Sequence, residues 1–420
     1  MKKYLNSQVS KNFIIYGATN AMASGLPLLL LPFLTNYLQP QDMAMIAMFQ
    51  LFYNFLQPFI GVNGTSLTNV VFYSKTDDQF NRHRSAVIWL ILITGLLVLL
   101  VVLPFNSIIF SYTGLSLKWL SVMVVFICFE QVNEFLLTYW RLLNKAWFFA
   151  IWRLLRVVFE LSLSIGIVMY FNSSWTGRVE GIVISGAIVG LASIVIILKQ
   201  NKGALFMHKI EMQEIIKFGI PFIPHVLGGI IINYSDLLFI RNMISEEATG
   251  LYSVGYQVGL IIGLVQNSFN QAWVPWFYAK LNNLTTEWNT RLVKMTYMYF
   301  AVLLLLAGGL YGIAPFLFSL FIDDRYIVAQ DFVGWIAFGF ALNGMYKMVV
   351  NYLIYLKLSK LIARVTFFVA ILNVVFNYLL IKENGAIGAA QSTALSFFLQ
   401  FVIIWYFSAR FYPMNWKLTK

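Results

Sequence analysis

The chain has 420 residues, of which 60% are hydrophobic and only 11% charged, with a formal net charge of +12. Soluble domains have about 25% charged residues, and no globular core could bury this much apolar surface, so the composition predicts an integral membrane protein. The only cysteine, Cys128, excludes a disulfide framework and a cysteine-rich metal site. His83, His208 and His225 lie far apart without ligand spacing, so no metal site is expected.

Apolar segments of membrane-spanning length recur along the whole sequence. A transmembrane helix needs about 20 mostly apolar residues. Breaking the sequence at charges and polar turns predicts twelve such helices, at 12–38, 43–73, 86–111, 118–140, 146–171, 180–198, 215–243, 250–278, 291–313, 331–356, 361–381 and 386–409. The expected fold is an all-α membrane protein. Its loops are short, the longest lying around 199–214, so no soluble catalytic domain is expected.

A polar stripe runs along the 43–73 segment. Gln50, Asn54 and Gln57 follow one another at i, i+4 and i+7, which places them on one helix face. The stripe is extended by Gly61, Thr65 and Thr68. Such a stripe either lines an aqueous lumen between two lobes, where it would contact substrate, or packs against a neighbouring helix.

Opposite charges are spaced to meet across the 118–140 and 146–171 helices. Counting from the short turn between them puts Glu134 level with Arg153 and Glu130 level with Arg156. Glu160 shares the face of both arginines. The charges either form interhelical salt bridges or form a cavity wall that offers arginines to an anionic substrate, because the planar guanidinium binds phosphate with two hydrogen bonds.

The predicted helices at 12–38 and 215–243 each contain two prolines, and the second also contains an aspartate. Proline bends a helix by freeing a backbone carbonyl, and each segment has two, which are Pro27 and Pro32, and Pro221 and Pro224. The kinks could serve as gates or be static bends. Asp236 lies nearer the periplasmic end, where it could pair with Lys347 or bind a coupling cation such as H⁺ or Na⁺.

Two later helices carry further candidates for substrate contact. The 250–278 helix repeats a polar stripe with Gln266 and Asn270, preceded by Gly259 and Gly263. Lys347 lies inside the 331–356 helix with no acidic residue near it in sequence. A lysine at that depth is the best single candidate for an anion contact, because a charge in the bilayer needs a partner.

Similar stretches recur at about half the chain length. "FYSK" at 72–75 and "FYAK" at 277–280 are 205 residues apart, Gly17 matches Gly219, and Pro104-Phe105 and Pro315-Phe316 are expected to end related helices. The pattern predicts two six-helix lobes, 1–205 and 206–420, in the same orientation. Transporters with parallel repeats hold substrate between their halves and rock them for alternating access.

The distribution of lysine and arginine predicts the orientation. The side that holds the N-terminus has 23 of the 29 basic residues, the other side has 5, and Lys347 is in mid-membrane. Basic loops stay in the cytoplasm, so both termini are expected there. The same loops explain the net charge as contacts to lipid headgroups rather than to nucleic acid.

Three stretches resemble a known family. "EEATGLYSVGYQVGLIIGLVQNSFNQAWVPWFY" at 246–278, "LPFLTNYLQPQDMAMIAMFQ" at 31–50 and "NYLLIKENGAIGAAQSTALSF" at 377–397 are similar to Wzx-type O-antigen flippases. These belong to the polysaccharide-exporter branch of the multidrug/oligosaccharidyl-lipid/polysaccharide (MOP) superfamily. The resemblance covers the whole chain. One departure is that Leu237, rather than a basic residue, follows Asp236.

The resemblance implies a V-shaped bundle that moves undecaprenyl-diphosphate-linked oligosaccharide from the cytoplasmic to the periplasmic leaflet of the bacterial inner membrane. It implies no enzymatic step and no cofactor beyond coupling to H⁺ or Na⁺. A polymerase and a chain-length regulator of the same pathway are the expected protein partners. Two alternatives remain open: a MATE-type drug antiporter, favoured by the acidic residues, and an O-antigen polymerase, which would be expected to have a large periplasmic loop.

Overall fold

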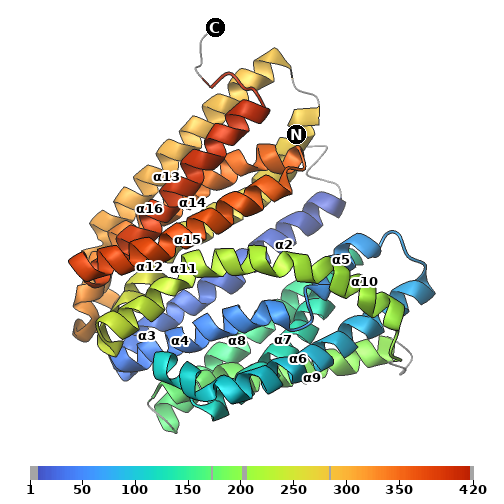
Figure 1. Cartoon of the computed structure of the whole chain (residues 1–420), viewed down its shortest axis with the longest axis horizontal. Coiled ribbons are helices and arrows are strands. Elements are labelled where there is room, and N and C mark those ends of the chain that lie inside the picture. Colours follow the sequence, from blue (N-terminus) through green and yellow to red (C-terminus); the bar gives the residue numbers. More distant parts are fainter. Residues whose placement is uncertain (1–7, 172–173, 201–205, 283–284, 417–420) are drawn as a thin grey trace. The chain divides into compact units, whose positions relative to one another are not determined.

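A computed structural model describes residues 8–171, 174–200, 206–282 and 285–416. All regular elements in these ranges are helices (Figure 1). The expected loop at 199–214 lies partly outside them, as do the two chain ends. The helices are α2 Gln8–Gly25, η1 Leu26–Leu30, α3 Leu31–Tyr37, α4 Pro40–Leu56, η2 Gln57–Phe59, α5 Gly64–Val71, α6 Asp77–Thr113, α7 Leu117–Leu142, α8 Ala146–Tyr170, α9 Trp175–Gln200, α10 Lys209–Gly219, η3 Ile220–Phe222, α11 Ile223–Met243, α12 Glu246–Asn282, α13 Thr286–Phe321, η4 Asp324–Ala329, α14 Gln330–Tyr355, α15 Ser359–Asn384 and α16 Ala386–Phe411.

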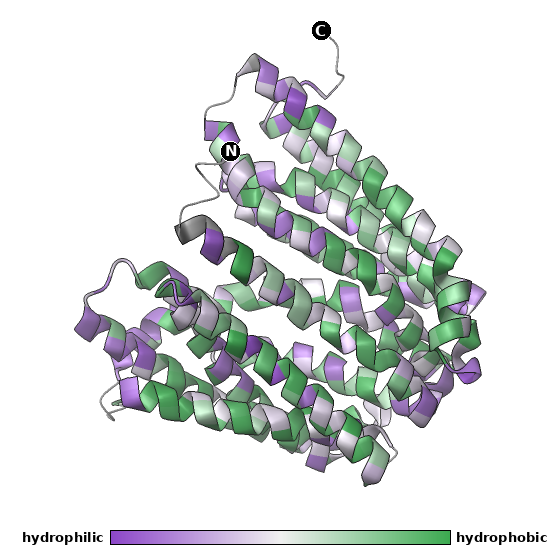
Figure 2. Cartoon of the chain, turned by 180° about the vertical axis from the view of Figure 1, so that it is seen from behind, coloured by the Kyte–Doolittle hydropathy of each residue, from purple (hydrophilic) through white to green (hydrophobic). Residues whose placement is uncertain are grey.

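The predicted helical segments correspond to these elements. In the described part of the chain, nine helices are long and apolar enough to cross a membrane, and two bent helix pairs raise the number to eleven. The remaining predicted segment is α8, which has 25 residues but contains Arg153, Arg156 and Glu160. Apolar residues dominate most helices (Figure 2). The all-α membrane class is therefore confirmed, and the twelfth span stays a prediction.

The first and seventh predicted helices are both interrupted at prolines. Short 3₁₀ segments separate α2 from α3 and α10 from α11, and they contain Pro27 and Pro221. The proline ring removes a backbone donor and disfavours continuous α-helix. The seventh helix bends by 48°, so both kinked segments deviate from a straight helix as their prolines predict.

The helix predicted at 43–73 is not continuous. It breaks between η2 and α5, where Gly61, Val62 and Asn63 have positive φ angles of 75°, 47° and 54°. The Gly61 amide donates to Thr94 Oγ1 at 2.8 Å instead of continuing the helix. The bend of 49° interrupts the helix within the predicted polar stripe, but Gln57 and Thr65, on either side of the break, line the same cavity. Thr68 is buried, and its Oγ1 lies 3.0 Å from His83 Nε2.

The chain divides into two compact units, and each consists of two stretches. One comprises Met1–Leu30 and Met45–Ile230, and the other comprises Leu31–Ala44 and Ile231–Lys420. In the first, α9 packs on α7 and α8. In the second, α14 packs on α12, α13 and α16. The two lobes at 1–205 and 206–420 are inferred from the sequence repeat rather than from these compact units, and they stay a prediction.

The helices that follow the two "FY-K" stretches begin in the same way. Thr76 caps α6 by accepting from the Gln79 amide, and Thr285 caps α13 by accepting from the Trp288 amide. Pro104 and Pro315 lie inside these helices, which continue to Thr113 and Phe321. The expectation that these prolines end the helices is therefore wrong.

Within the second compact unit, Arg325 connects η4 to the end of the first predicted helix. Its Nη2 donates to the carbonyls of Thr35 and Asn36, each at 2.9 Å. Its Nε donates to Asp323 Oδ1 at 2.7 Å. This hydrogen bond holds the pKa of the Asp323 carboxyl below its ordinary value. The bond also fixes the guanidinium against both carbonyls.

Candidate functional site

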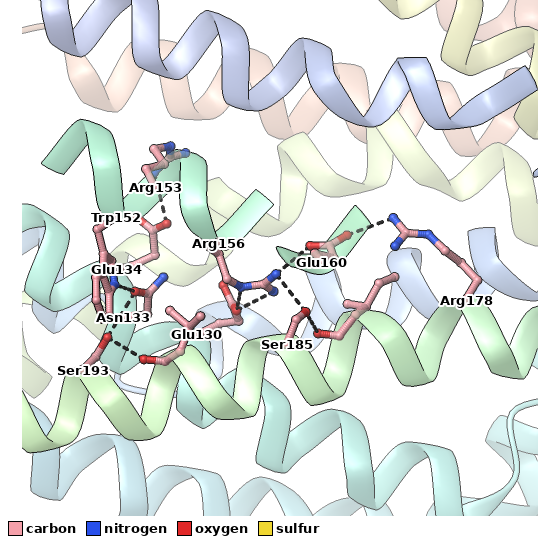
Figure 3. Close-up of polar contacts among 12 residues, drawn as sticks. Glu130, Asn133, Glu134, Trp152, Arg153, Arg156, Glu160, Arg178, Ser185 and Ser193 are labelled. Carbon is pink, nitrogen blue, oxygen red and sulfur yellow. Dashed lines mark hydrogen bonds and ion pairs between the residues drawn. The ribbon is translucent and has the colours of Figure 1, made fainter. Parts of the chain in front are cut away.

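Four charged side chains form a continuous chain across α7, α8 and α9 (Figure 3). Arg156 Nη2 lies 2.8 Å from Glu130 Oε1, and its Nη1 lies 2.8 Å from Glu160 Oε2. Arg178 Nη2 binds the other oxygen of Glu160 at 2.9 Å. Beside this chain, Arg153 Nη1 lies 3.3 Å from Glu134 Oε1. The pairs Glu130–Arg156 and Glu134–Arg153 are those that counting from the α7–α8 turn predicts.

All three nitrogens of the Arg156 guanidinium donate to protein acceptors. Its Nε donates to Glu130 Oε1 at 3.0 Å, and its Nη1 also donates to Ser185 Oγ at 3.1 Å. Only 9% of its side chain is exposed. This geometry favours interhelical pairing for Arg156. The ion pair of Arg153 is longer, and the Arg153 side chain is 29% exposed, which leaves Arg153 the more accessible of the two.

Arg178 is not among the site residues that the sequence predicts, because it is one of the five basic residues on the side opposite the N-terminus. Arg178 Nη1 donates to Ser164 Oγ, which ties the start of α9 to α8. A count of charges could have found it. Three glutamates and two arginines leave one carboxylate without a cation, and an uncompensated buried charge is costly. The nearest cation after Glu160 in sequence is Arg178.

Small residues on α9 allow the close packing that assembles this network. A Cβ at Gly181 would lie 2.6 Å from Ser164 Cα, and one at Gly186 would lie 2.9 Å from Glu130 Oε1. Asn133 Oδ1 accepts hydrogen bonds from Trp152 Nε1 at 2.9 Å and from Ser193 Oγ at 3.2 Å. The network is thus held by α7, α8 and α9 together.

The stripe residues of α4 and η2 lie in different surroundings. Gln50 is exposed, and its carbonyl accepts from Asn54 Nδ2 at 2.8 Å. Gln57 lines a cavity of about 270 Å³ that also contacts Glu130 and Glu134. Gln57 therefore faces a cavity rather than a neighbouring helix.

The stripe of α12 faces α14. Gln266 is 1% exposed, and its Nε2 donates to Asn343 Oδ1 at 3.0 Å. Asn270 Oδ1 accepts from Asn351 Nδ2 at 3.4 Å. A Cβ at Gly259 would contact the Ile336 side chain. These contacts support the alternative in which small residues and amides hold two helices together.

Lys347 has a neutral partner. Its Nζ donates to Asn267 Oδ1 on α12. In the described ranges, no carboxylate forms an ion pair with it, and the alternative pair with Asp236 is not formed. A cation inside a long apolar helix with only an amide acceptor keeps its charge available for an anion.

Asp236 lies in a polar cluster between helices of the same compact unit. It is 1% exposed, and it accepts hydrogen bonds from the Tyr252 hydroxyl and from the Leu237 amide. The Thr393 hydroxyl faces it from α16. Nearby, Asn377 donates to Ser235 Oγ at 3.1 Å. The Oδ1 of Asn377 is buried without a hydrogen-bond partner among the described residues. The Tyr252 hydroxyl and the Leu237 amide, which donate to the Asp236 carboxylate, are both neutral.

Long apolar helices with ionic and amide groups buried among them define a multi-pass membrane protein. The chain belongs to the family described as polysaccharide biosynthesis protein, which matches residues 9–279. It is 24% identical to protein 1 of the Lsg locus of Haemophilus influenzae over 363 residues, which cover 85% of this chain and 87% of that protein. It is 26% identical to an uncharacterized membrane protein of the same organism, over 64% of this chain and 65% of the other.

Solved structures share the fold. An inward closed conformation of the lipid II flippase MurJ matches with a TM-score of 0.76 and 16% identity, over 94% of this chain and 87% of that chain. An inward-facing MATE multidrug resistance transporter of the MOP superfamily matches with a TM-score of 0.68 and 14% identity, over 95% and 94%. These named neighbours are a flippase and a transporter. The family match confirms the predicted resemblance to polysaccharide-exporting proteins, and the solved structures show the shared fold.

Proposed function

We propose that this protein flips an undecaprenyl-diphosphate-linked oligosaccharide, a repeat unit of O-antigen or another surface polysaccharide, across the bacterial inner membrane. Transport proceeds by alternating access from the cytoplasmic to the periplasmic leaflet, with both termini in the cytoplasm. Membership of the polysaccharide biosynthesis family supports a glycan as cargo. The shared fold with a lipid II flippase supports movement of a lipid-linked molecule. Translocation breaks no bond, so the protein acts as a transporter rather than an enzyme.

The single observation that carries the anionic part of the proposal is Lys347. Its charge is balanced by no carboxylate in the described ranges, whereas Arg156 is bound by two. A diphosphate is a strong anion that an ammonium group attracts as a point charge. Lys347 is therefore proposed as the diphosphate contact, and Arg153 as the more accessible arginine. Arg156 would contact substrate only by releasing a carboxylate.

The amides are proposed as contacts for polar sugar groups. Gln57 is the first candidate because it lines a cavity, and Gln50 and Asn54 precede it on α4. Gln266 and Asn270 are engaged with α14. In this proposal, they contact the glycan only in a state where the α12–α14 contacts loosen.

Coupling to H⁺ or Na⁺ is proposed at Asp236. A buried carboxylate that accepts only from neutral donors can take up a proton or coordinate a cation. The Tyr252 hydroxyl, which binds the carboxylate, is proposed as a further oxygen ligand. Glu130, Glu134 and Glu160 are proposed as structural charge partners, since each binds arginine.

The test is a gel of lipopolysaccharide from a deletion strain of the source bacterium. We expect loss of every rung, including the single-repeat band, because the repeat unit would never reach the periplasm. A surviving single-repeat band would contradict the flippase and indicate a polymerase, because the unit would have crossed without being polymerised. An unchanged ladder would contradict the O-antigen assignment and direct attention to drug export, as in the MATE neighbours, or to a different surface glycan.

A further inference from the structure

A second cavity lies where the start of α2 meets the turn between α7 and α8. Its volume is about 650 Å³, and its lining comes from positions 11, 12, 14 and 15 of α2 and from 144–148. All of these positions belong to the same compact unit. Asn12, which is 8% exposed, donates from Nδ2 to the Asn144 carbonyl at 3.3 Å. This hydrogen bond joins the two walls of the cavity.

Each wall of the cavity contributes a lysine. Lys11 comes from α2 and Lys145 from the residue before α8, and both are exposed. In the ranges that the structure describes, no carboxylate forms an ion pair with either lysine. No aspartate or glutamate is among the described lining residues. Two ammonium groups without a compensating carboxylate attract an anion, so the cavity suits an anionic ligand.

Exposed apolar side chains on the same cavity indicate that the anion belongs to a lipid. Ile14, Trp147 and Phe148 line the cavity and are 54%, 67% and 62% exposed. Lys145 Nζ lies 5.9 Å from the centre of the Phe148 ring, so a basic group adjoins the apolar surface. A soluble anion gains nothing from apolar surface, whereas a phospholipid has a phosphate next to its acyl chains. Tryptophan also prefers the level of the lipid headgroups.

The predicted membrane orientation agrees with this ligand. Lys11 and Lys145 are both among the basic residues on the side that holds the N-terminus, which is predicted to be cytoplasmic. Basic pockets between transmembrane helices on that side bind the headgroups of anionic lipids. We propose that the cavity between α2 and the α7–α8 turn binds an anionic phospholipid. Lys11 and Lys145 hold its phosphate, and its acyl chains pack on Trp147 and Phe148. The bound lipid joins the start of α2 to α8 and is independent of the cargo.

The experiment measures lipid binding to delipidated full-length protein by native mass spectrometry. The probes are phosphatidylglycerol, which is anionic, and phosphatidylcholine, which has a phosphate but no net charge. We expect the wild-type protein to prefer phosphatidylglycerol. The double variant Lys11→Gln with Lys145→Gln should weaken binding of phosphatidylglycerol about thirtyfold, the effect of two basic residues near an anionic lipid. It should leave binding of phosphatidylcholine unchanged.

Lys118→Gln is the matched control. Lys118 is also an exposed lysine at the start of a helix, and its Nζ lies 5.2 Å from the centre of the Trp119 ring. It does not line this cavity, so Lys118→Gln should bind phosphatidylglycerol as the wild type does. If the double variant does not fold, each single variant, Lys11→Gln or Lys145→Gln, should weaken binding about fivefold.

Other outcomes would overturn the proposal. Equal affinity of the wild-type protein for both lipids would show that the cavity does not select an anion. Unchanged binding of phosphatidylglycerol by the double variant would place the lipid elsewhere. Undecaprenyl diphosphate serves as a third probe, and if the double variant weakens it more than phosphatidylglycerol, the cavity belongs to the cargo lipid. Displacement of phosphatidylglycerol by inorganic phosphate alone would indicate a site for a free anion.

Discussion

Arg156 and Lys347 are both cations inside long helices of a membrane protein, but their partners differ. Arg156 binds two carboxylates and a serine hydroxyl, whereas Lys347 binds one amide oxygen. The planar guanidinium suits several fixed acceptors, while the ammonium group is a compact point charge. From this difference we expect Arg156 to stabilise the folded protein and Lys347 to be needed for transport.

Substitution of Lys347 should separate transport from folding. We expect Lys347→Ala to abolish translocation, because the diphosphate loses its charge partner, while the amount of protein in the membrane stays normal. Lys347→Arg should retain partial activity, since it keeps the charge with a different shape. The measurement is the lipopolysaccharide ladder of the complemented deletion strain, with membrane protein quantified by immunoblot. A normal ladder with Lys347→Ala would refute the assignment.

Substitution of Arg156 should destabilise the protein. Arg156→Ala leaves Glu130 without a cation and Glu160 with only Arg178. Removing one partner of a buried ion pair costs about 3–5 kcal/mol. Arg153→Ala is the control, because its pair is longer and more exposed and should cost about 1 kcal/mol or less. Thermal unfolding in detergent compares the two, and equal melting temperatures would contradict this role for Arg156.

At the scale of the element, α9 determines how closely the helices of the charge network approach. A Cβ at Gly181 would meet the Ser164 backbone of α8, and a Cβ at Gly186 or Gly190 would meet the Phe126 or Phe129 side chain of α7. Glycine permits this approach because it has no Cβ. The approach brings Arg178 to Ser164 and Glu160. The ionic contacts therefore require the close helix packing that these small residues allow.

A methyl group at Gly181 should disturb this packing. A Cβ there would lie 2.6 Å from Ser164 Cα and 2.7 Å from Ser164 N, which are backbone atoms that cannot rotate away. We expect Gly181→Ala to destabilise the protein by about 1–3 kcal/mol, the typical cost of overpacking. Gly166→Ala is the control on α8, where no atom lies within 4 Å of the added Cβ. If both variants melt like the wild type, the close contact is unimportant for stability.

Helix positions were predicted correctly where they depend on nearby residues, and incorrectly where a contact with a distant residue breaks the helix. Apolar runs, together with the charges and polar turns between them, predicted the helices, because each of these signals depends on nearby residues. The break at 60–63 involves a hydrogen bond from Gly61 to Thr94, 33 residues away. No periodicity within 43–73 indicates that contact. The same break places Asn63 in the cavity lining.

At the scale of the whole molecule, the distribution of basic residues predicts the membrane orientation. Fusion of a green fluorescent protein to the C-terminus should give fluorescent cells, and fusion of alkaline phosphatase there should be inactive, because both termini are expected in the cytoplasm. A phosphatase fusion after Lys118, one of the five basic residues predicted on the side opposite the N-terminus, is the positive control. An active C-terminal phosphatase fusion would reverse the orientation and with it the direction of transport.

The sequence by itself determined the membrane class, the helices and the register of α7 against α8, because apolar length and helical spacing are local properties. It therefore predicted the pairs Glu134–Arg153 and Glu130–Arg156. Tertiary structure alone decided that Arg178 completes the network, that the α12 stripe faces α14 and that Asn63 enters a cavity. These outcomes depend on which helices become neighbours, and neighbours are chosen by packing across the whole chain.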